Sequence, residues 1–65
     1  MQVGDKVEFQ FFNTPEGVFY GPIHKGEIIA MRAQSKPFQV KYRIEETTID
    51  SDIWLHRKEI KRVIN

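Results

Sequence analysis

The chain has 65 residues, a formal net charge of +1 and no cysteine. This length favours one domain, 1–65, with a small core, and the lack of cysteine excludes disulfides, thiolate zinc sites and cysteine nucleophiles. The longest apolar run, Ile28–Met31, is far shorter than the roughly 20 residues of a membrane helix. We therefore predict a cytoplasmic protein that makes no contact with a membrane.

The apolar residues favour β-structure. Thirteen are Ile or Val and seven are Phe or Tyr, whereas only one is Leu and two are Ala. Branched and aromatic side chains fit the pleated, half-buried surface of a sheet, while Leu and Ala dominate helices. The composition therefore predicts an all-β fold.

In the first half of the chain, Val3–Val7 starts a predicted strand in which polar and apolar residues alternate as far as Phe11. Residues 14–17 then predict a turn, with proline in the second position and glycine in the fourth. Residues 18–25 form either a long connection or an irregular strand, because Pro22 cannot donate to a central ladder. A second strand is expected over residues 26–31.

In the second half, a loop over residues 33–37 precedes the clearest alternating segment, a strand over residues 38–44. A fourth strand is predicted over residues 49–55, one helical turn over residues 56–59, and a short last strand over residues 60–64. Five strands and one turn in a chain of this length predict a small, partly open antiparallel barrel.

The pairing of the third and fourth strands predicts which residues share the outer face. Alternation in the third strand turns Val40 to the core and Lys41 and Arg43 outward. If Leu55 also faces the core, antiparallel pairing joins even-numbered to odd-numbered positions in whatever register the turn selects. Trp54 is therefore expected on the outer face, on the same side as the cations.

Three segments resemble SH3-like barrels of the Tudor and KOW type: Val3–Val7, Gly26–Ile29 and Trp54–Val63. The stretch Asp50–Ile53 with the basic residues after it resembles the C-terminal DNA-binding domain of retroviral integrases. The opening segment and Ile60–Asn65 resemble the plasmid-encoded, trimethoprim-resistant dihydrofolate reductases. The likeness implies an SH3-like barrel over nearly the whole chain.

The resemblance to the reductases does not extend to their activity. That family assembles a tetrameric pore around a Val-Gln-Ile-Tyr strand, and the corresponding residues 52–55 here contain neither the glutamine nor the tyrosine. Ser35 and Ser51 lack the glycine context of a nucleophile. Asp52 and His56 would lie about 13 Å apart along a strand, too far to share one metal ion. We predict a protein without enzymatic activity, cofactor or metal.

The charges are unevenly distributed along the chain. Residues 32–44 carry four cations and no carboxylate, and residues 53–65 carry four cations and one carboxylate, whereas residues 1–31 and 45–52 are acidic. Cations that hold phosphates beside an indole that stacks on a base are typical of nucleic-acid binding. The predicted nucleic-acid-binding residues are Arg32, Lys36, Lys41, Arg43, Trp54, His56, Arg57 and Lys58.

Two features weigh against this interpretation. A loop, the last turn or a second subunit could cover Trp54 instead of a ligand. The acidic residues between the two basic stretches would also repel a phosphate backbone that crosses the connection between the third and fourth predicted strands. They are Glu45, Glu46, Asp50 and Asp52.

The alternative hypothesis is a protein-interaction module or a homo-oligomeric accessory protein. Phe12, Phe19 and Tyr20 are many large aromatic residues for one connection. They either cover the barrel or form a protein-binding groove, and with Tyr42 or Trp54 they could enclose a methylated cation.

Overall fold

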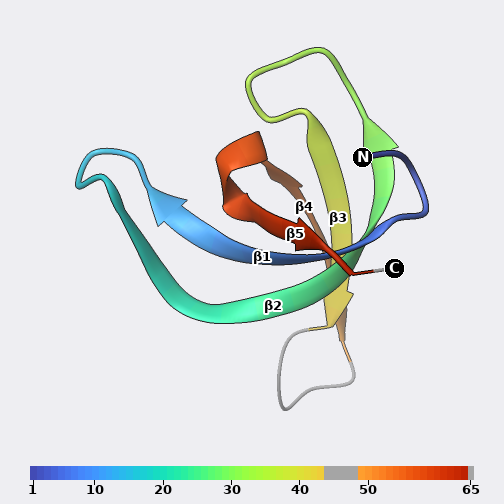
Figure 1. Ribbon diagram of the computed structural model, residues 1–65, viewed down its shortest axis with the longest axis horizontal. Coiled ribbons are helices and arrows are strands. Elements are labelled where there is room, and N and C mark those ends of the chain that lie inside the picture. The colour runs from blue at the N-terminus through green and yellow to red at the C-terminus, as the bar shows by residue number, and fades with distance from the viewer. Residues whose placement is uncertain (44–48, 65) are drawn as a thin grey trace.

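The computed structural model describes residues 1–43 and 49–64. Its elements are β1 (Lys6–Asn13), β2 (Val18–Met31), β3 (Phe38–Arg43), β4 (Asp50–Leu55), the 3-10 turn η1 (Arg57–Glu59) and β5 (Ile60–Val63) (Figure 1). The predicted all-β class and the single helical turn before the last strand are confirmed. None of the described residues belongs to a helix long and apolar enough to cross a membrane.

The strands form one antiparallel sheet in the order β4-β3-β2-β1-β5. β2 is the longest strand, with 14 residues, and curves across the molecule so that its first part pairs with β1 and its second part with both β1 and β3 (Figure 1). In the described residues, β4 and β5 stand at the two ends of this order and are not hydrogen-bonded to each other. The sheet is therefore open between β4 and β5, which is consistent with the expected partly open barrel.

The segment 18–25 is the first part of β2, so the irregular-strand interpretation is the correct one. Pro22 lies where the β1–β2 register shifts, between the pairs Phe9–His24 and Phe11–Tyr20. Its missing N–H therefore costs no regular ladder hydrogen bond. Gly21 adopts a φ of 73° at the same place, and its carbonyl oxygen accepts a hydrogen bond from the side chain of Gln10.

The predicted turn between the first two strands is also present. The N–H of Gly17 donates to the carbonyl oxygens of Asn13 at 2.8 Å and Thr14 at 3.3 Å. Gly17 has a φ of 68°, which glycine adopts without steric cost. β1 continues to Asn13, two residues beyond its predicted end, because Phe12 and Asn13 pair with the start of β2.

The core consists of alternate residues from four strands, and its fully buried members are Val7, Phe9, Ile28, Phe38, Val40 and Leu55. The β3–β4 register pairs Phe38 with Leu55 and Gln39 with Trp54, so the predicted odd–even pairing and the outer position of Trp54 are confirmed. Ile44, which the alternation of the third predicted strand also turns toward the core, lies outside the described residues, as do Glu45 and Glu46.

Candidate nucleic-acid interface

Charges alternate in sign across the outer face of the sheet. Lys6 pairs with Glu27, Glu27 with Lys41, and Lys41 with Asp52 on four neighbouring strands. Directly opposite residues of an antiparallel pair lie close enough for their charges to interact. Lys41 therefore has a carboxylate opposite it on each neighbouring strand, without a direct ion pair to either of these two residues.

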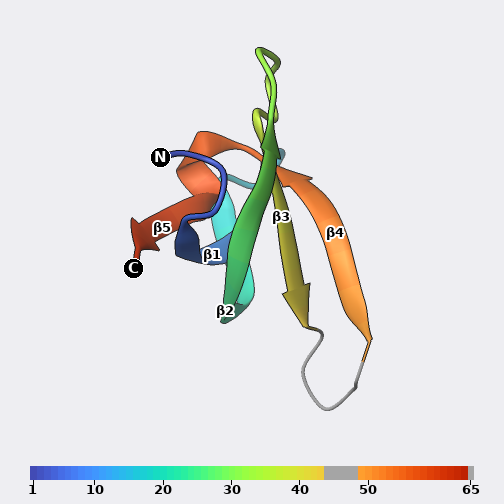
Figure 2. The ribbon, with the colours of Figure 1, turned by 90° about the vertical axis from the view of Figure 1, so that its right-hand side faces the viewer.

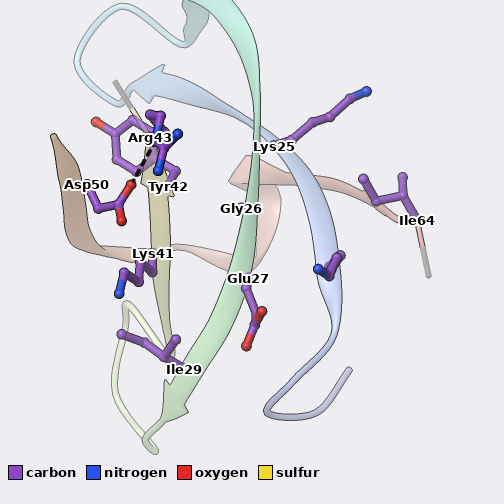
Figure 3. Close-up of a pocket in the computed structure, with 10 residues that line it drawn as sticks. Lys25, Gly26, Glu27, Ile29, Lys41, Tyr42, Arg43, Asp50 and Ile64 are labelled. Atoms are coloured by element: carbon purple, nitrogen blue, oxygen red, sulfur yellow. Dashed lines mark hydrogen bonds and ion pairs between the residues drawn. The ribbon is translucent and has the colours of Figure 1, made fainter. Parts of the chain in front are cut away.

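Arg43, the other predicted cation of this face, forms a direct ion pair. Its Nε donates to Oδ1 of Asp50 at 3.3 Å, and Arg62 pairs with Glu8 farther along the sheet. A groove of about 750 Å³ runs over this face, and its charged lining residues are Lys6, Lys25, Lys41, Arg43, Glu27 and Asp50 (Figure 3). Figure 3 shows Lys25 pointing away from Lys41 and Arg43. In the part of the chain that the structure describes, this face therefore presents mixed charge and no convergent group of cations.

A second group of cations gathers at the other end of the sheet. Figure 2 shows the loop between β2 and β3 and the turn η1 at one end, whereas β3 ends at the opposite end. The cations near the first end are Arg32, Lys36, Arg57, Lys58 and Lys61. None of these five forms an ion pair with any residue that the structure describes. No carboxylate in residues 1–43 and 49–64 is therefore directly paired with them.

Four of these cations lie over aromatic rings. The distances to the ring centroids are 3.8 Å for Arg32 over Trp54, 4.7 Å for Lys58 over Phe12, 3.2 Å for Lys61 over Phe19 and 5.4 Å for Arg57 over Phe38. In such contacts the cation is attracted to the face of the ring and keeps its formal charge. We call this surface the cationic aromatic end; it comprises Arg32, Lys36, Arg57, Lys58 and Lys61 with the rings of Phe12, Phe19 and Trp54, whereas Phe38 beneath Arg57 is a buried core residue.

Trp54 is half-buried, and its cover comes from within the chain. The guanidinium of Arg32 lies over the indole, and Arg32 is itself oriented by a hydrogen bond from its Nε to the carbonyl oxygen of Lys36 at 3.1 Å. Arg32 is exposed, so a ligand that stacks on this face of the indole would displace or share its guanidinium.

A pocket of about 270 Å³ lies where three segments meet: the β1–β2 hairpin, the β4–η1 corner and the β2–β3 loop. Its lining residues are Phe11, Phe12, Thr14, Tyr20, Lys36, Ile53, Trp54, Leu55, His56 and Glu59. Lys36, Trp54 and His56 come from the predicted nucleic-acid set. Phe12 and Tyr20 come from the predicted protein-binding set, so the fold places members of both sets around one cavity.

The aromatic residues of the β1–β2 hairpin lie in paired strands and not in a loop. Phe12 lies edge-on to Phe19 with centroids 4.9 Å apart, and Phe11 stacks on Tyr20 at 5.9 Å. Phe12 is half-buried, whereas Phe19 and Tyr20 are exposed. The sequence placed these residues in a connection; the strand pairing instead holds them in fixed positions beside the pocket.

Glu59 builds the pocket wall, and sequence reasoning missed its role. Only 6% of the residue is exposed, and its two carboxylate oxygens accept backbone N–H bonds from Phe12 at 3.1 Å and His56 at 2.9 Å. The side chain therefore ties η1 to β1. An acidic residue three positions after a helix-capping residue is a known signal for such folding back, and His56 and Glu59 have that spacing.

Lys61 was also missed as a candidate, although alternation in the last strand could have placed it on the surface. Its contact with Phe19 joins segments more than 40 residues apart, which local patterns do not reveal. Among residues 1–43 and 49–64, no three His, Asp or Glu side chains are grouped so that they could hold a metal ion.

The chain was compared with family models, curated proteins and solved structures, and none of them matches it.

Proposed function

We propose that this protein is a noncatalytic module, with the SH3-like barrel architecture suggested by its sequence, that binds nucleic acid through the cationic aromatic end. The observation that carries the proposal is the collection of five cations without carboxylate partners among the described residues, four of them on aromatic rings. Lysine and arginine neutralise phosphates, and flat rings stack on bases. One surface supplies both kinds of contact.

The sheet face is the weaker candidate for this role. Lys41 and Arg43 belong to the predicted set, but Glu27, Asp52 and Asp50 lie beside them. A phosphate that approaches these cations also meets the carboxylates, which reduces the attraction. We therefore assign the main contact to Arg32, Lys36, Trp54, His56, Arg57 and Lys58 of the predicted set, with Lys61 added.

The proposal is tested by titrating labelled single-stranded and duplex DNA and RNA with the protein at two salt concentrations. We expect Arg57→Ala combined with Lys58→Ala to weaken binding several-fold at low salt. The slope of log affinity against log salt should also fall in magnitude by about one to two units. Binding with fewer phosphate contacts releases fewer counterions. The matched control is Lys41→Ala with Arg43→Ala, which removes the same charge from the sheet face.

Two results would contradict the proposal. One is the absence of salt-sensitive binding to any of the four nucleic acids. The other is an equal loss of affinity in the two double variants, since that would mean that net charge alone sets the binding. Thermal melts of both variants ensure that unfolding is not the cause.

A second candidate function is association with protein, including another copy of the chain. The first part of β2 carries four exposed apolar residues: Val18, Phe19, Tyr20 and Ile23. An exposed apolar patch of this kind marks many interaction sites. Sedimentation of the protein with and without Val18→Ser and Ile23→Ser tests self-association; a concentration-dependent dimer that these changes abolish would favour this function.

A further inference from the structure

We propose that the pocket between the β1–β2 hairpin and the β4–η1 corner receives one unpaired base, so that the preferred ligand is single-stranded nucleic acid. This inference rests on the proposed function and names its ligand class. It follows from the size of the pocket, the aromatic rings around it and the placement of charge at its wall and rim.

The size of the pocket limits its occupant to one small group. Its volume is about 270 Å³, just below the range of about 300–1,000 Å³ that is typical of sites for drug-sized ligands. A base within a duplex is covered by stacked neighbours on both faces and by its partner along one edge. It must leave the stack before a protein pocket can take it. A single strand presents such bases at much lower cost.

Aromatic side chains from two separate segments line the pocket. Phe11, Phe12 and Tyr20 come from the hairpin, and Trp54 comes from β4. Stacking on aromatic rings is tolerant of base identity, because every base has a flat π-face. The rings are held in place by Phe11–Tyr20 stacking and by the backbone bond from Phe12 to Glu59, so the surface exists before the ligand arrives.

The charges orient the nucleotide. Glu59 places a carboxylate at the pocket wall, whereas Lys36 lines the pocket and Arg32 and Lys58 lie on the rings of Trp54 and Phe12. The carboxylate repels a phosphate, and the three cations attract it. The phosphate therefore stays with the cations while the base enters the pocket.

Each oxygen of the Glu59 carboxylate accepts one backbone N–H and keeps a second acceptor position, which the amino group of a base can fill. Cytosine presents its N4 amino group where uracil presents a carbonyl oxygen, and an acidic side chain accepts a hydrogen bond from that amino group. The two pyrimidines are otherwise nearly identical in size and shape. Cytosine is therefore expected to bind more tightly than uracil.

Intrinsic fluorescence can follow the pocket directly, because Trp54 is the only tryptophan in the chain. The protein is titrated with ten-residue oligocytidylate, oligouridylate and a mixed-sequence duplex of the same length, with polyglutamate as a polyanion control. We expect the single strands to change the Trp54 emission, oligocytidylate to bind several-fold more tightly than oligouridylate, and the duplex to bind at least tenfold more weakly than oligocytidylate.

Two variants at the pocket are compared with one on the same strand outside it. Tyr20→Ala removes a ring from the pocket, and because 53% of Tyr20 is exposed the fold should survive. It should weaken oligocytidylate binding five-fold or more, while Val18→Ala, an exposed change outside the pocket, leaves binding unchanged. Glu59→Gln should reduce the preference for cytidylate, and the ratio of the two affinities is informative even if the variant is less stable.

The possible failures are distinguishable. If nucleic acid binds with the expected dependence on Arg57 and Lys58, but Tyr20→Ala behaves like Val18→Ala or the duplex binds equally well, the base pocket is wrong and the proposed function stands. If polyglutamate changes the Trp54 emission as oligocytidylate does, an acidic peptide is the better occupant and the base pocket is also wrong. If no nucleic acid binds at low salt, both the inference and the proposed function fail.

Discussion

The outer sheet face and the cationic aromatic end both contain lysine and arginine, yet they differ in what surrounds each cation. On the sheet face, Lys41 lies between Glu27 and Asp52, and Arg43 bonds to Asp50. At the other end, Arg32 lies on the ring of Trp54 without an ion pair to any described residue. The two regions therefore differ in the side chains next to each cation, which are acidic on the sheet face and aromatic at the other end. The number of cations alone does not describe this difference.

The two regions contribute similarly small amounts to stability. An exposed ion pair contributes about 0–1 kcal/mol, and an exposed cation–π contact contributes about 0.5–1 kcal/mol. The difference therefore concerns the potential presented to a ligand and leaves folding almost unaffected. Substitutions that separate binding from stability are the sharpest way to examine it.

The largest effect is expected from Val40→Asp, which should unfold the protein and so abolish both regions. Val40 is fully buried, and Val40→Asp places an unpaired carboxylate in a core of six fully buried residues. The cost is several kcal/mol, which is comparable with the total stability of about 5 kcal/mol at the lower end of the range for small domains. Circular dichroism should show no cooperative melt. A melt close to that of the wild type would mean that the two faces of β3 are assigned the wrong way round.

Glu59→Ala should damage the cationic aromatic end more than the sheet face. It leaves the N–H groups of Phe12 and His56 without their acceptor, at a cost of about 1–3 kcal/mol for each donor that stays buried. Hydrogen exchange should accelerate first at these two amides and in η1. Uniform acceleration across all five strands would contradict a local role for Glu59.

Gly26→Ala tests the close approach of β2 and β3 that brings Glu27 opposite Lys41. A Cβ at Gly26 would lie 2.5 Å from Cγ1 of Val40 and 2.8 Å from the carbonyl oxygen of Lys41. Overpacking of this kind costs about 1–3 kcal/mol. We expect a lower midpoint in urea. Ala30→Gly, at a half-buried position of the same strand, measures the effect on stability of exchanging alanine and glycine without this close contact. An unchanged midpoint for Gly26→Ala would show that β2 and β3 are farther apart than the structure places them.

The smallest effect on stability comes from reversing single charges. Lys41→Glu puts three carboxylates in a row across the sheet and should lower stability by up to about 1 kcal/mol. Lys36→Glu, at the exposed β2–β3 loop, should leave the melt unchanged and weaken nucleic-acid binding more than Lys41→Glu does. If the two variants exchange these effects, the sheet face is the binding surface.

Much of the barrel could be predicted because side-chain alternation along a strand is a local property. The face of Val40 and the outward position of Trp54 follow from a period of two and hold for any register of the same parity. The first part of β2 was harder to predict, since Pro22 argues against a strand unless the neighbouring register shifts at that residue. A shift of this kind depends on how two strands twist together.

The sequence by itself determined the all-β class, the order of the elements, the inner and outer faces and the basic stretches, because each depends on residues close together in the chain. Only the tertiary structure decided which cations are offset and which are not. The β2–β3 and β3–β4 registers place Lys41 opposite two carboxylates, whereas the packing of η1 against β1 brings Glu59 and Lys58 to Phe12. Charges and rings separated by tens of residues meet only when the sheet curves, so no local pattern contains their partnership.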